Sequence, residues 1–313
     1  MKLICRSAPW VGAALLLACS ALVRAAPAQA SPAFPAHYSV PYLQVETADV
    51  GDVAADMNAS GDKFYSLAFL TPTPGSGCLP LWEDNNDPMA AFTSQVKSLQ
   101  SAGGNVIISF GGASGGELAI SCRSTSKLEA AYAKVVSTYG VNRLDFDIEG
   151  NDLNNTTANA RRDTALAELE TADPRLTIDY TLPVHATGLT SNALALLKDA
   201  KHKGVKVNLV NVMTMDFGNG QNVLADAESA ARATAGQLAH LYGITTAAAY
   251  DLLGLTPIAG HNNDEEDFTE ADARKLESFA ANHGVQDLSF WEVDRYDKPV
   301  GYAYSKTFQK ITS

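Results

Sequence analysis

The segment that decides the fold reads Leu144-Asp145-Phe146-Asp147-Ile148-Glu149-Gly150. Successive side chains of a β-strand point to opposite faces, so the three apolar residues share one face and the three acids share the other. A strand buried on both faces of a parallel sheet normally consists of Val, Ile and Leu throughout. Three acids on one face are unfavourable unless they are paired or one of them keeps a proton. We therefore interpret the segment as a strand that carries a functional site.

The rest of the chain alternates short apolar runs with longer amphipathic stretches. Eight apolar runs predict strands: Ser39–Val45, Lys63–Leu70, Asn105–Phe110, Arg143–Ile148, Leu176–Val184, Val207–Phe217, Leu255–Ala259 and Asp287–Val293. Apolar residues three and four apart predict helices between most of these runs. The predicted helices cover Ala90–Ala102, Lys127–Tyr139, Ala158–Thr171, Asn192–His202, Asp226–Tyr242 and Glu270–His283. Glycine, a common helix stop signal, lies at or just after the end of five: Gly103, Gly140, Gly204, Gly243 and Gly284.

Alternating strands and helices predict a sheet of parallel strands. Eight strands with no chain left over favour a closed (β/α)8 barrel over an open doubly wound sheet. The 283 residues after position 30 suit the ~250 residues typical of that barrel. No linker rich in Pro, Ser or Gly follows residue 36, so we expect one barrel domain over residues 31–313. Active sites of such barrels lie at the carboxyl ends of the strands.

The first 30 residues have the pattern of a secretory signal peptide. Lys2 and Arg6 make a positive start, an uncharged apolar stretch follows over Trp10–Val23, and Ala28-Gln29-Ala30 is a small-x-small cleavage pattern. The apolar stretch is shorter than the ~20 residues that span a membrane. We expect cleavage after position 30 and a secreted protein. The alternative is lipid attachment at Cys19, which follows a small residue in the leader.

The full chain has 313 residues, with 35 Asp and Glu against 23 Lys and Arg. A hydrophobic fraction of 46% excludes a disordered chain. The acidic balance argues against sequence-independent binding of nucleic acid and against docking on anionic lipid. Cleavage would remove Lys2, Arg6 and Arg24 and no acid, leaving 20 basic residues and a net charge of −15.

Two cysteines remain after cleavage, Cys78 and Cys122. An exported protein meets an oxidising environment, so the pair predicts one disulfide, and the alternative is two buried free thiols. The two residues lie in loops after the second and third predicted strands, which are neighbours at the same end of a barrel. A bond between them would hold two walls of the cleft together.

The carboxylate segment resembles the Asp-x-x-Asp-x-Asp-x-Glu signature of glycoside hydrolase family 18, the chitinase family. Asp145, Asp147 and Glu149 match its last three acids, and Asn142 stands at the position of the first. Ser109-Phe110-Gly111-Gly112 is similar to the family's Ser-x-Gly-Gly segment, so Gly111 and Gly112 are expected beside the substrate, leaving room for side chains in the centre of the barrel. The resemblance covers nearly the whole mature chain in strand order and implies a (β/α)8 barrel.

The resemblance implies a retaining glycosidase that cuts β-1,4 links between N-acetylglucosamine units, with no cofactor or metal. In this family the 2-acetamido oxygen of the substrate attacks the anomeric carbon, and the enzyme supplies no nucleophile. By resemblance, Glu149 protonates the leaving oxygen and then deprotonates the incoming water. Asp147 would orient the acetamido group, and Asp145 would hold the pair through a shared proton and tune its pKa values.

Further substrate contacts are expected at the ends of other strands. Met213-Thr214-Met215-Asp216 is similar to the family's Met-x-Tyr-Asp, with Met215 at the position of the tyrosine. The resemblance implies substrate contacts from Met213, Met215 and Asp216. Trp291 stands where the family places a tryptophan under the sugar bound at the cleavage point.

Methionine cannot donate a hydrogen bond to the acetamido oxygen as the family's tyrosine does. Either another group supplies the donor, with Tyr180 on the fifth strand as a candidate, or catalysis relies on Asp147 alone. Trp82, in the loop after the second strand, is either a second sugar platform or a residue packed under its own loop.

Only Gly260–Asp267 connect the seventh strand to its helix, so the α+β domain that some family members carry there is expected to be missing. An open groove without that domain predicts endo-type cutting. The expected partner is a chitin-type polysaccharide or oligosaccharide, with neither nucleic acid nor membrane, and the mature protein is expected to be a monomer.

Other functions fit parts of the sequence. Gly112-Ala113-Ser114-Gly115-Gly116 matches the nucleophile elbow of serine hydrolases, with His261 or His283 as a partner, although the helix that the elbow requires does not follow at once. A sugar-binding barrel without catalysis is the alternative from another class, and the presence of Glu149 argues against it. An endo-β-N-acetylglucosaminidase acting on N-glycans also fits. The six histidines are scattered, so no zinc site is expected.

Overall fold

The computed structural model describes residues 31–45, 53–83, 87–114, 116–220 and 222–312. Residues 31–313 form one compact unit. The predicted signal peptide and Cys19 lie outside the described residues. Every helix in the described part of the chain is too short or too polar to cross a membrane.

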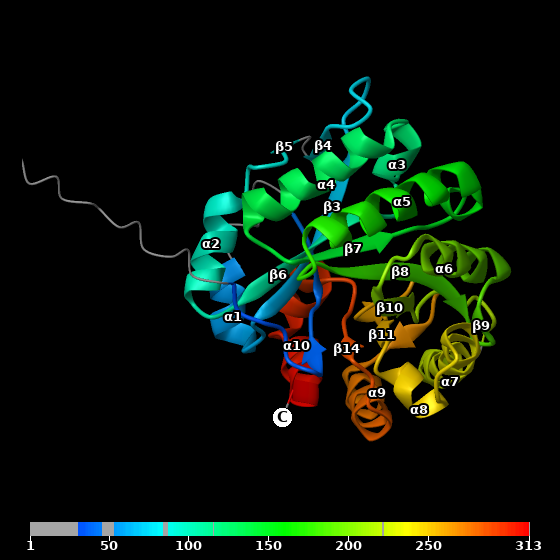
Figure 1. Ribbon diagram of the computed structural model, residues 1–313. Coiled ribbons are helices and arrows are strands. Elements are labelled where there is room, and N and C mark those ends of the chain that lie inside the picture. Colours follow the sequence, from blue (N-terminus) through cyan, green and yellow to red (C-terminus); the bar gives the residue numbers. More distant parts are fainter. Residues whose placement is uncertain (1–30, 46–52, 84–86, 115, 221, 313) are drawn as a thin grey trace, which may run out of the picture. The chain divides into compact units, whose positions relative to one another are not determined.

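The compact unit is built on a ring of parallel strands with the helices outside it (Figure 1). The strands of the ring are β1 (Tyr38–Ser39), β2 (Tyr42–Gln44), β3 (Phe64–Pro72), β6 (Asn105–Gly111), β7 (Arg143–Asp147), β8 (Thr177–His185), β10 (Val207–Met213), β11 (Leu253–Thr256) and β14 (Asp287–Leu288). From β2 to β14, each strand pairs in parallel with the next one of the ring. These elements match the eight predicted runs in order.

The two short strands β1 and β2 close the ring, because they are successive parts of one extended segment. β1 pairs with β14, whereas β2 pairs with β3. Between them, the Tyr42 nitrogen donates to the Phe290 carbonyl at 3.0 Å, and the Ser66 nitrogen donates to the Pro41 carbonyl at 3.0 Å. The segment therefore joins the last strand to the second, and the predicted (β/α)8 barrel is confirmed.

The helices are α1 (Val53–Ser60), α2 (Thr93–Ser101), α3 (Leu118–Ser121), α4 (Thr125–Tyr139), α5 (Thr156–Ala172), α6 (Ser191–Lys203), α7 (Val223–Tyr242), α8 (Thr246–Tyr250), α9 (Glu270–His283) and α10 (Ala303–Phe308). Four of the six predicted helices, α4 to α7, begin one to three residues before the predicted positions, because a polar side chain caps each of them, whereas α2 begins three residues later and α9 begins where predicted. Ser124 caps α4, Asn155 caps α5, and Thr269 forms a capping box with Asp272. Left-handed glycines end four helices: Gly140, Gly204, Gly243 and Gly284.

Short antiparallel strands, which the sequence did not predict, extend the barrel at its loops. β4 (Pro80–Trp82) and β5 (Asp87–Pro88) continue from β3, and β9 (Gly188–Leu189) pairs with β8. β12 (Gly260–His261) and β13 (Asp267–Phe268) form a hairpin between β11 and α9. This hairpin occupies the position of the α+β insert, so the barrel lacks that domain, as predicted.

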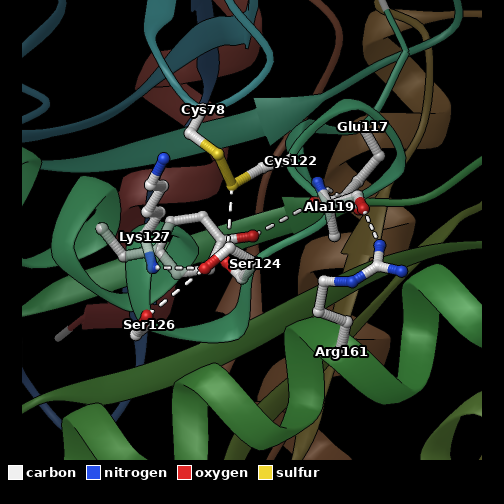
Figure 2. The surroundings of a disulfide bond; sticks show 9 residues. Cys78, Glu117, Ala119, Cys122, Ser124, Ser126, Lys127 and Arg161 are labelled. Atoms are coloured by element: carbon white, nitrogen blue, oxygen red, sulfur yellow. Dashed lines mark hydrogen bonds between the residues drawn. A yellow bond between two sulfur atoms is a disulfide. The ribbon is translucent and has the colours of Figure 1, made fainter.

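The predicted disulfide between Cys78 and Cys122 is present (Figure 2). It joins the loop between β3 and β4 to the end of α3, which follows β6. Figure 2 also shows Arg161 of α5 donating a hydrogen bond to the carbonyl of Ala119 in α3. The loops after two neighbouring strands are therefore tied to each other and to the outer helices.

The double variant Cys78→Ala/Cys122→Ala is expected to lose about 2–4 kcal/mol of unfolding free energy, because the bond spans a sequence separation of 44 and restricts the unfolded chain. Urea denaturation under oxidising conditions measures this loss. The wild type under reducing conditions is the control and should unfold at the same midpoint as the variant. Equal stability of the variant and the oxidised wild type would contradict the expectation.

Candidate active site

The three acids of the carboxylate segment lie at the carboxyl end of β7. Asp145 and Asp147 face the barrel interior with 2% and 6% of their surface exposed. Between them, Phe146 is fully buried on the outer face, where its ring stacks on Phe110 at 5.3 Å. The alternation of faces predicted from the sequence is therefore present, and Glu149 follows just beyond the strand.

Three hydroxyl groups from three other strands bind the carboxylate of Asp145. Tyr42 and Ser109 donate to its Oδ2 at 3.0 and 2.6 Å, and Thr181 donates to its Oδ1 at 2.7 Å. Burial raises the pKa of Asp145 to about 6, although the bond from Ser109 opposes the rise. Both oxygens accept hydrogen bonds, and these bonds favour the ionised form, opposing the effect of burial.

Asp147 and Glu149 form a hydrogen-bonded pair above Asp145. Burial, and next the charge of Glu149, raises the pKa of Asp147 well above its usual value. Burial also raises the pKa of Glu149. Two carboxyl groups that bond each other must share a proton, so this pair can hold one proton at a pH where exposed carboxyls are ionised.

Gly111 permits close approach of a neighbouring backbone, and Gly112 permits close approach of a side chain. Both have a left-handed φ, 102° and 83°. A Cβ on Gly111 would collide with the carbonyl oxygen of Asp147, and one on Gly112 would lie 2.5 Å from the ring of Phe69. The Gly112 nitrogen donates to that same carbonyl at 3.1 Å. The expectation that these glycines leave room for side chains is confirmed for Gly112, which faces the ring of Phe69, whereas Gly111 admits the backbone of Asp147 instead.

Trp291 lies on the same side of the barrel as the carboxylates and is partly exposed. Its ring stacks on Phe69 with centroids 5.6 Å apart and an interplanar angle of 8°. The ring of Tyr42 lies 6.0 Å from both of these aromatic rings. Tyr42 therefore links the aromatic cluster to Asp145, because its hydroxyl group bonds that carboxylate.

Met213 and Met215 are half-buried at the end of β10, and Asp216 follows them in an exposed position. The two carboxylate oxygens of Asp216 accept hydrogen bonds from the backbone and side-chain nitrogens of Asn263, both at 2.7 Å. The β12–β13 hairpin therefore positions Asp216, which has a left-handed φ of 50°.

Tyr180 points away from the barrel interior, so its candidacy as the missing donor is wrong. Its strand register aligns it with Phe146, and both residues therefore lie on the outer face. The hydroxyl of Tyr180 donates to Asp163 of α5 at 2.6 Å, and the guanidinium of Arg162 lies 5.3 Å from its ring. The alternation that placed the acids inside could have excluded Tyr180, had the register been known.

Trp82 is fully buried, so its interpretation as a sugar platform is wrong and the packing alternative is correct. Its Nε1 donates to the hydroxyl of Tyr139 at 3.0 Å and to the carbonyl of Met89 at 3.2 Å. The serine-hydrolase alternative also finds no support, since His261 bonds Asp267 and His283 bonds the carbonyl of Phe279 rather than Ser114.

Sequence reasoning missed four polar residues of the barrel interior. These are Tyr42, Thr181, Asn211 and Thr256, all at most 3% exposed and all connected by hydrogen bonds to Asp145 or to one another. The sequence did show that these are polar residues inside strands predicted to be buried, and that pattern could have marked them as candidates. Their register relative to Asp145 could not be read from the sequence, because it depends on the stagger of the strands in the closed barrel.

Trp82→Phe is expected to lower the free energy of unfolding by about 1–3 kcal/mol, because it leaves buried hydrogen-bond partners without their donor. Urea denaturation measures the loss. In a double-mutant cycle with Tyr139→Phe, the two losses should not be additive, since the pair shares one bond. Unchanged stability together with weaker sugar binding would restore the platform interpretation.

The chain is similar in sequence to proteins named as chitinases. The chain is 33% identical over 297 residues to a probable bifunctional chitinase/lysozyme of Escherichia coli, covering 90% of the chain and 33% of that protein. It is 32% identical over 280 residues to Endochitinase 11 of Metarhizium anisopliae, covering 84% of the chain and 53% of the relative. The chain thus spans a third to about half of these relatives' length. No protein-family model matches it.

Solved structures show the same architecture. The catalytic domain of the hyperthermophilic chitinase from Pyrococcus furiosus superposes with a TM-score of 0.81 at 29% identity, covering 90% of this chain and 97% of that one. A putative Chitinase A from Streptomyces coelicolor, 16% identical with a TM-score of 0.62 over 88% and 98% of the chains, shares the fold. The carboxylate strand, the barrel and these relatives together place the chain in glycoside hydrolase family 18.

Proposed function

We propose that the chain is a chitinase, which hydrolyses β-1,4 links between N-acetylglucosamine units by retaining, substrate-assisted catalysis. The observation that supports this most is the stack of three acids at the end of β7, in which Asp145 is bound by hydroxyl groups while Asp147 and Glu149 form a hydrogen-bonded pair. The similar Pyrococcus furiosus domain has been crystallised as catalytic-site mutants with chito-oligosaccharides, which supports the same class of substrate.

Glu149 is the proposed acid and base. Burial raises its pKa, as a proton donor requires, and it is the least buried of the three acids. The proton passes from Glu149 to the glycosidic oxygen as the bond from that oxygen to the anomeric carbon breaks. The acetamido oxygen of the substrate bonds the same carbon, giving an oxazolinium ion. Water then attacks that carbon and the bond to the acetamido oxygen breaks, while Glu149 takes a proton from the water.

Asp147 orients the acetamido group and stabilises the positive charge that develops on it. The family's tyrosine donor is replaced by Met215, and Tyr180 faces the outer helices. Neither position supplies a hydroxyl group to the acetamido oxygen, so orientation by Asp147 is the alternative that we retain.

The proposed groove is open, because only the short β12–β13 hairpin follows β11. An open groove admits the middle of a chain, so we expect endo-type cutting. Trp291, partly exposed and backed by Phe69, is the proposed platform for the sugar at the cleavage point, with Met213, Met215 and Asp216 beside it.

We further propose that the first 30 residues direct secretion and are removed, and that the mature protein is a monomer. The Cys78–Cys122 bond supports an oxidising destination, because disulfides persist outside the cytosol. Mass spectrometry of the mature protein checks this: an amino terminus at Ser31 agrees with the proposal, whereas a lipid on Cys19 contradicts it.

Glu149→Gln is expected to lower kcat/KM on chito-oligosaccharides by about 10²–10⁴-fold, because the amide cannot transfer the proton. Glu168→Gln, the same change at an exposed position of α5, is the matched control and should leave the rate unchanged. Proton NMR of the first product should show the β-anomer, as retention requires. Unchanged cleavage by Glu149→Gln would contradict the mechanism.

The same pair of proteins separates the alternative functions. Cleavage of a high-mannose glycopeptide alone would assign the substrate to N-glycans. Binding of chito-oligosaccharides without turnover by the wild type would assign a sugar-binding role. Loss of activity with a serine-directed inhibitor, together with full activity of Glu149→Gln, would support the serine-hydrolase alternative with Ser114 as the nucleophile.

A further inference from the structure

One side-chain amide lies beside two of the three hydroxyl groups that bind Asp145. The Nδ2 atom of Asn211 on β10 lies 3.1 Å from the hydroxyl oxygen of Thr181 and 3.4 Å from that of Tyr42. The two hydroxyl oxygens lie 2.8 Å apart. These three side chains and that of Asp145 are all at most 3% exposed, so their hydrogen bonds lie away from bulk solvent.

The amide determines where the two hydroxyl hydrogens point. An amide nitrogen only donates, so the oxygens of Thr181 and Tyr42 act as acceptors toward Asn211. Each hydroxyl has one hydrogen, and the carboxylate of Asp145 lies within bonding distance of both. Both hydrogens can therefore be directed to Asp145. With the third bond from Ser109, the carboxylate accepts three hydrogen bonds, which stabilise its ionised form.

The orientation of the amide is in turn held by Thr256 on β11. The hydroxyl of Thr256 donates to Asn211 Oδ1 at 2.8 Å. In the reversed orientation, Oδ1 would face Thr181 and Tyr42 and accept their hydrogens, withdrawing them from Asp145. Gly254 provides the space for this arrangement, because a Cβ there would lie 2.9 Å from Asn211 Oδ1.

We infer that Asn211 and Thr256 are positioning residues for the proposed hydrolysis. They act through Thr181 and Tyr42 and hold Asp145 as an ionised acceptor, so that the shared proton stays on the Asp147–Glu149 pair. This inference rests on the proposed function, since it concerns the same site. The chain of bonds runs across four strands, from β11 through β10 and β8 to β7.

We call the hydrogen-bonded series from Thr256 through Asn211 to Thr181 and Tyr42 the relay. Other ionisable groups also face Asp145. Asp147 lies above it on β7, Tyr42 and Asp179 face it from β2 and β8, and Asp287 interacts with it from β14. Arg143, on the same strand as Asp145, forms an ion pair with Asp179. A change confined to the hydroxyl of Thr256 alters none of these charges.

Thr256→Val removes the hydroxyl and keeps the shape of the side chain. It is expected to raise the pKa of Asp145, followed by carbon-13 NMR titration of its carboxyl group. The acidic limb of kcat/KM against pH should move up by about half a unit to one unit, and kcat/KM at the optimum should fall about 3–10-fold, the effect of one lost hydrogen bond. Thr256→Ser, which keeps the donor, should restore the wild-type profile.

Thr234→Val is the matched control, because Thr234 is a buried threonine of α7 outside the relay. Its pH profile and Asp145 titration should match those of the wild type. Coincident titrations of Asp145 in Thr256→Val and wild type would overturn the inference. Thr256→Ala removes the same hydroxyl and replaces the valine variant if that one fails to fold. If the wild type cleaves no chito-oligosaccharide, the proposed function fails, and the NMR titration still tests the relay.

Discussion

The carboxylate of Asp145 lies buried inside the barrel, with 2% of its surface exposed, and the rest of the site depends on how its charge is stabilised there. Hydroxyl groups of Tyr42, Ser109 and Thr181 stabilise it in place of solvent. The charge of this carboxylate is one of the causes that raise the pKa of Asp147, which is hydrogen-bonded to Glu149, so the pair binds a proton more strongly. A neutral group at Asp145 would remove one of the charges that keep that proton bound.

The barrel provides this environment by bringing distant parts of the chain to one place. The segment at residues 38–44 closes the ring and delivers Tyr42, whose hydroxyl bonds Asp145 and whose ring lies beside Trp291. Because Gly111 has no side chain, the backbone of Asp147 packs directly against it. The neighbouring strands β6 and β7 thereby fix the position of the Asp147 carboxyl along the barrel. The proton-sharing pair and the aromatic surface are thereby held on the same side of the barrel.

Local patterns in the sequence predicted the strands, most helices and the disulfide, because periodicity, caps and cysteines act over short stretches of chain. The same patterns missed α1, whose buried residues Val53, Asp56 and Ser60 do not form an apolar stripe. They also missed the short antiparallel strands, which depend on pairing with β3 and β8. The sequence left open whether Trp82 binds sugar, and it offered Tyr180 as a donor to the substrate. Residue type alone does not say which face of a strand is covered, so neither question could be decided from the sequence.

The sequence by itself determined that three acids share the inner face of one strand, since the alternation of side chains is a property of a single strand. It also determined the order of strands and helices, and hence the barrel. Only the tertiary structure decided which groups meet those acids. Thr181, Asn211 and Thr256 lie on three different strands, and the stagger between strands, which exists only in the closed barrel, brings their polar atoms within hydrogen-bonding distance.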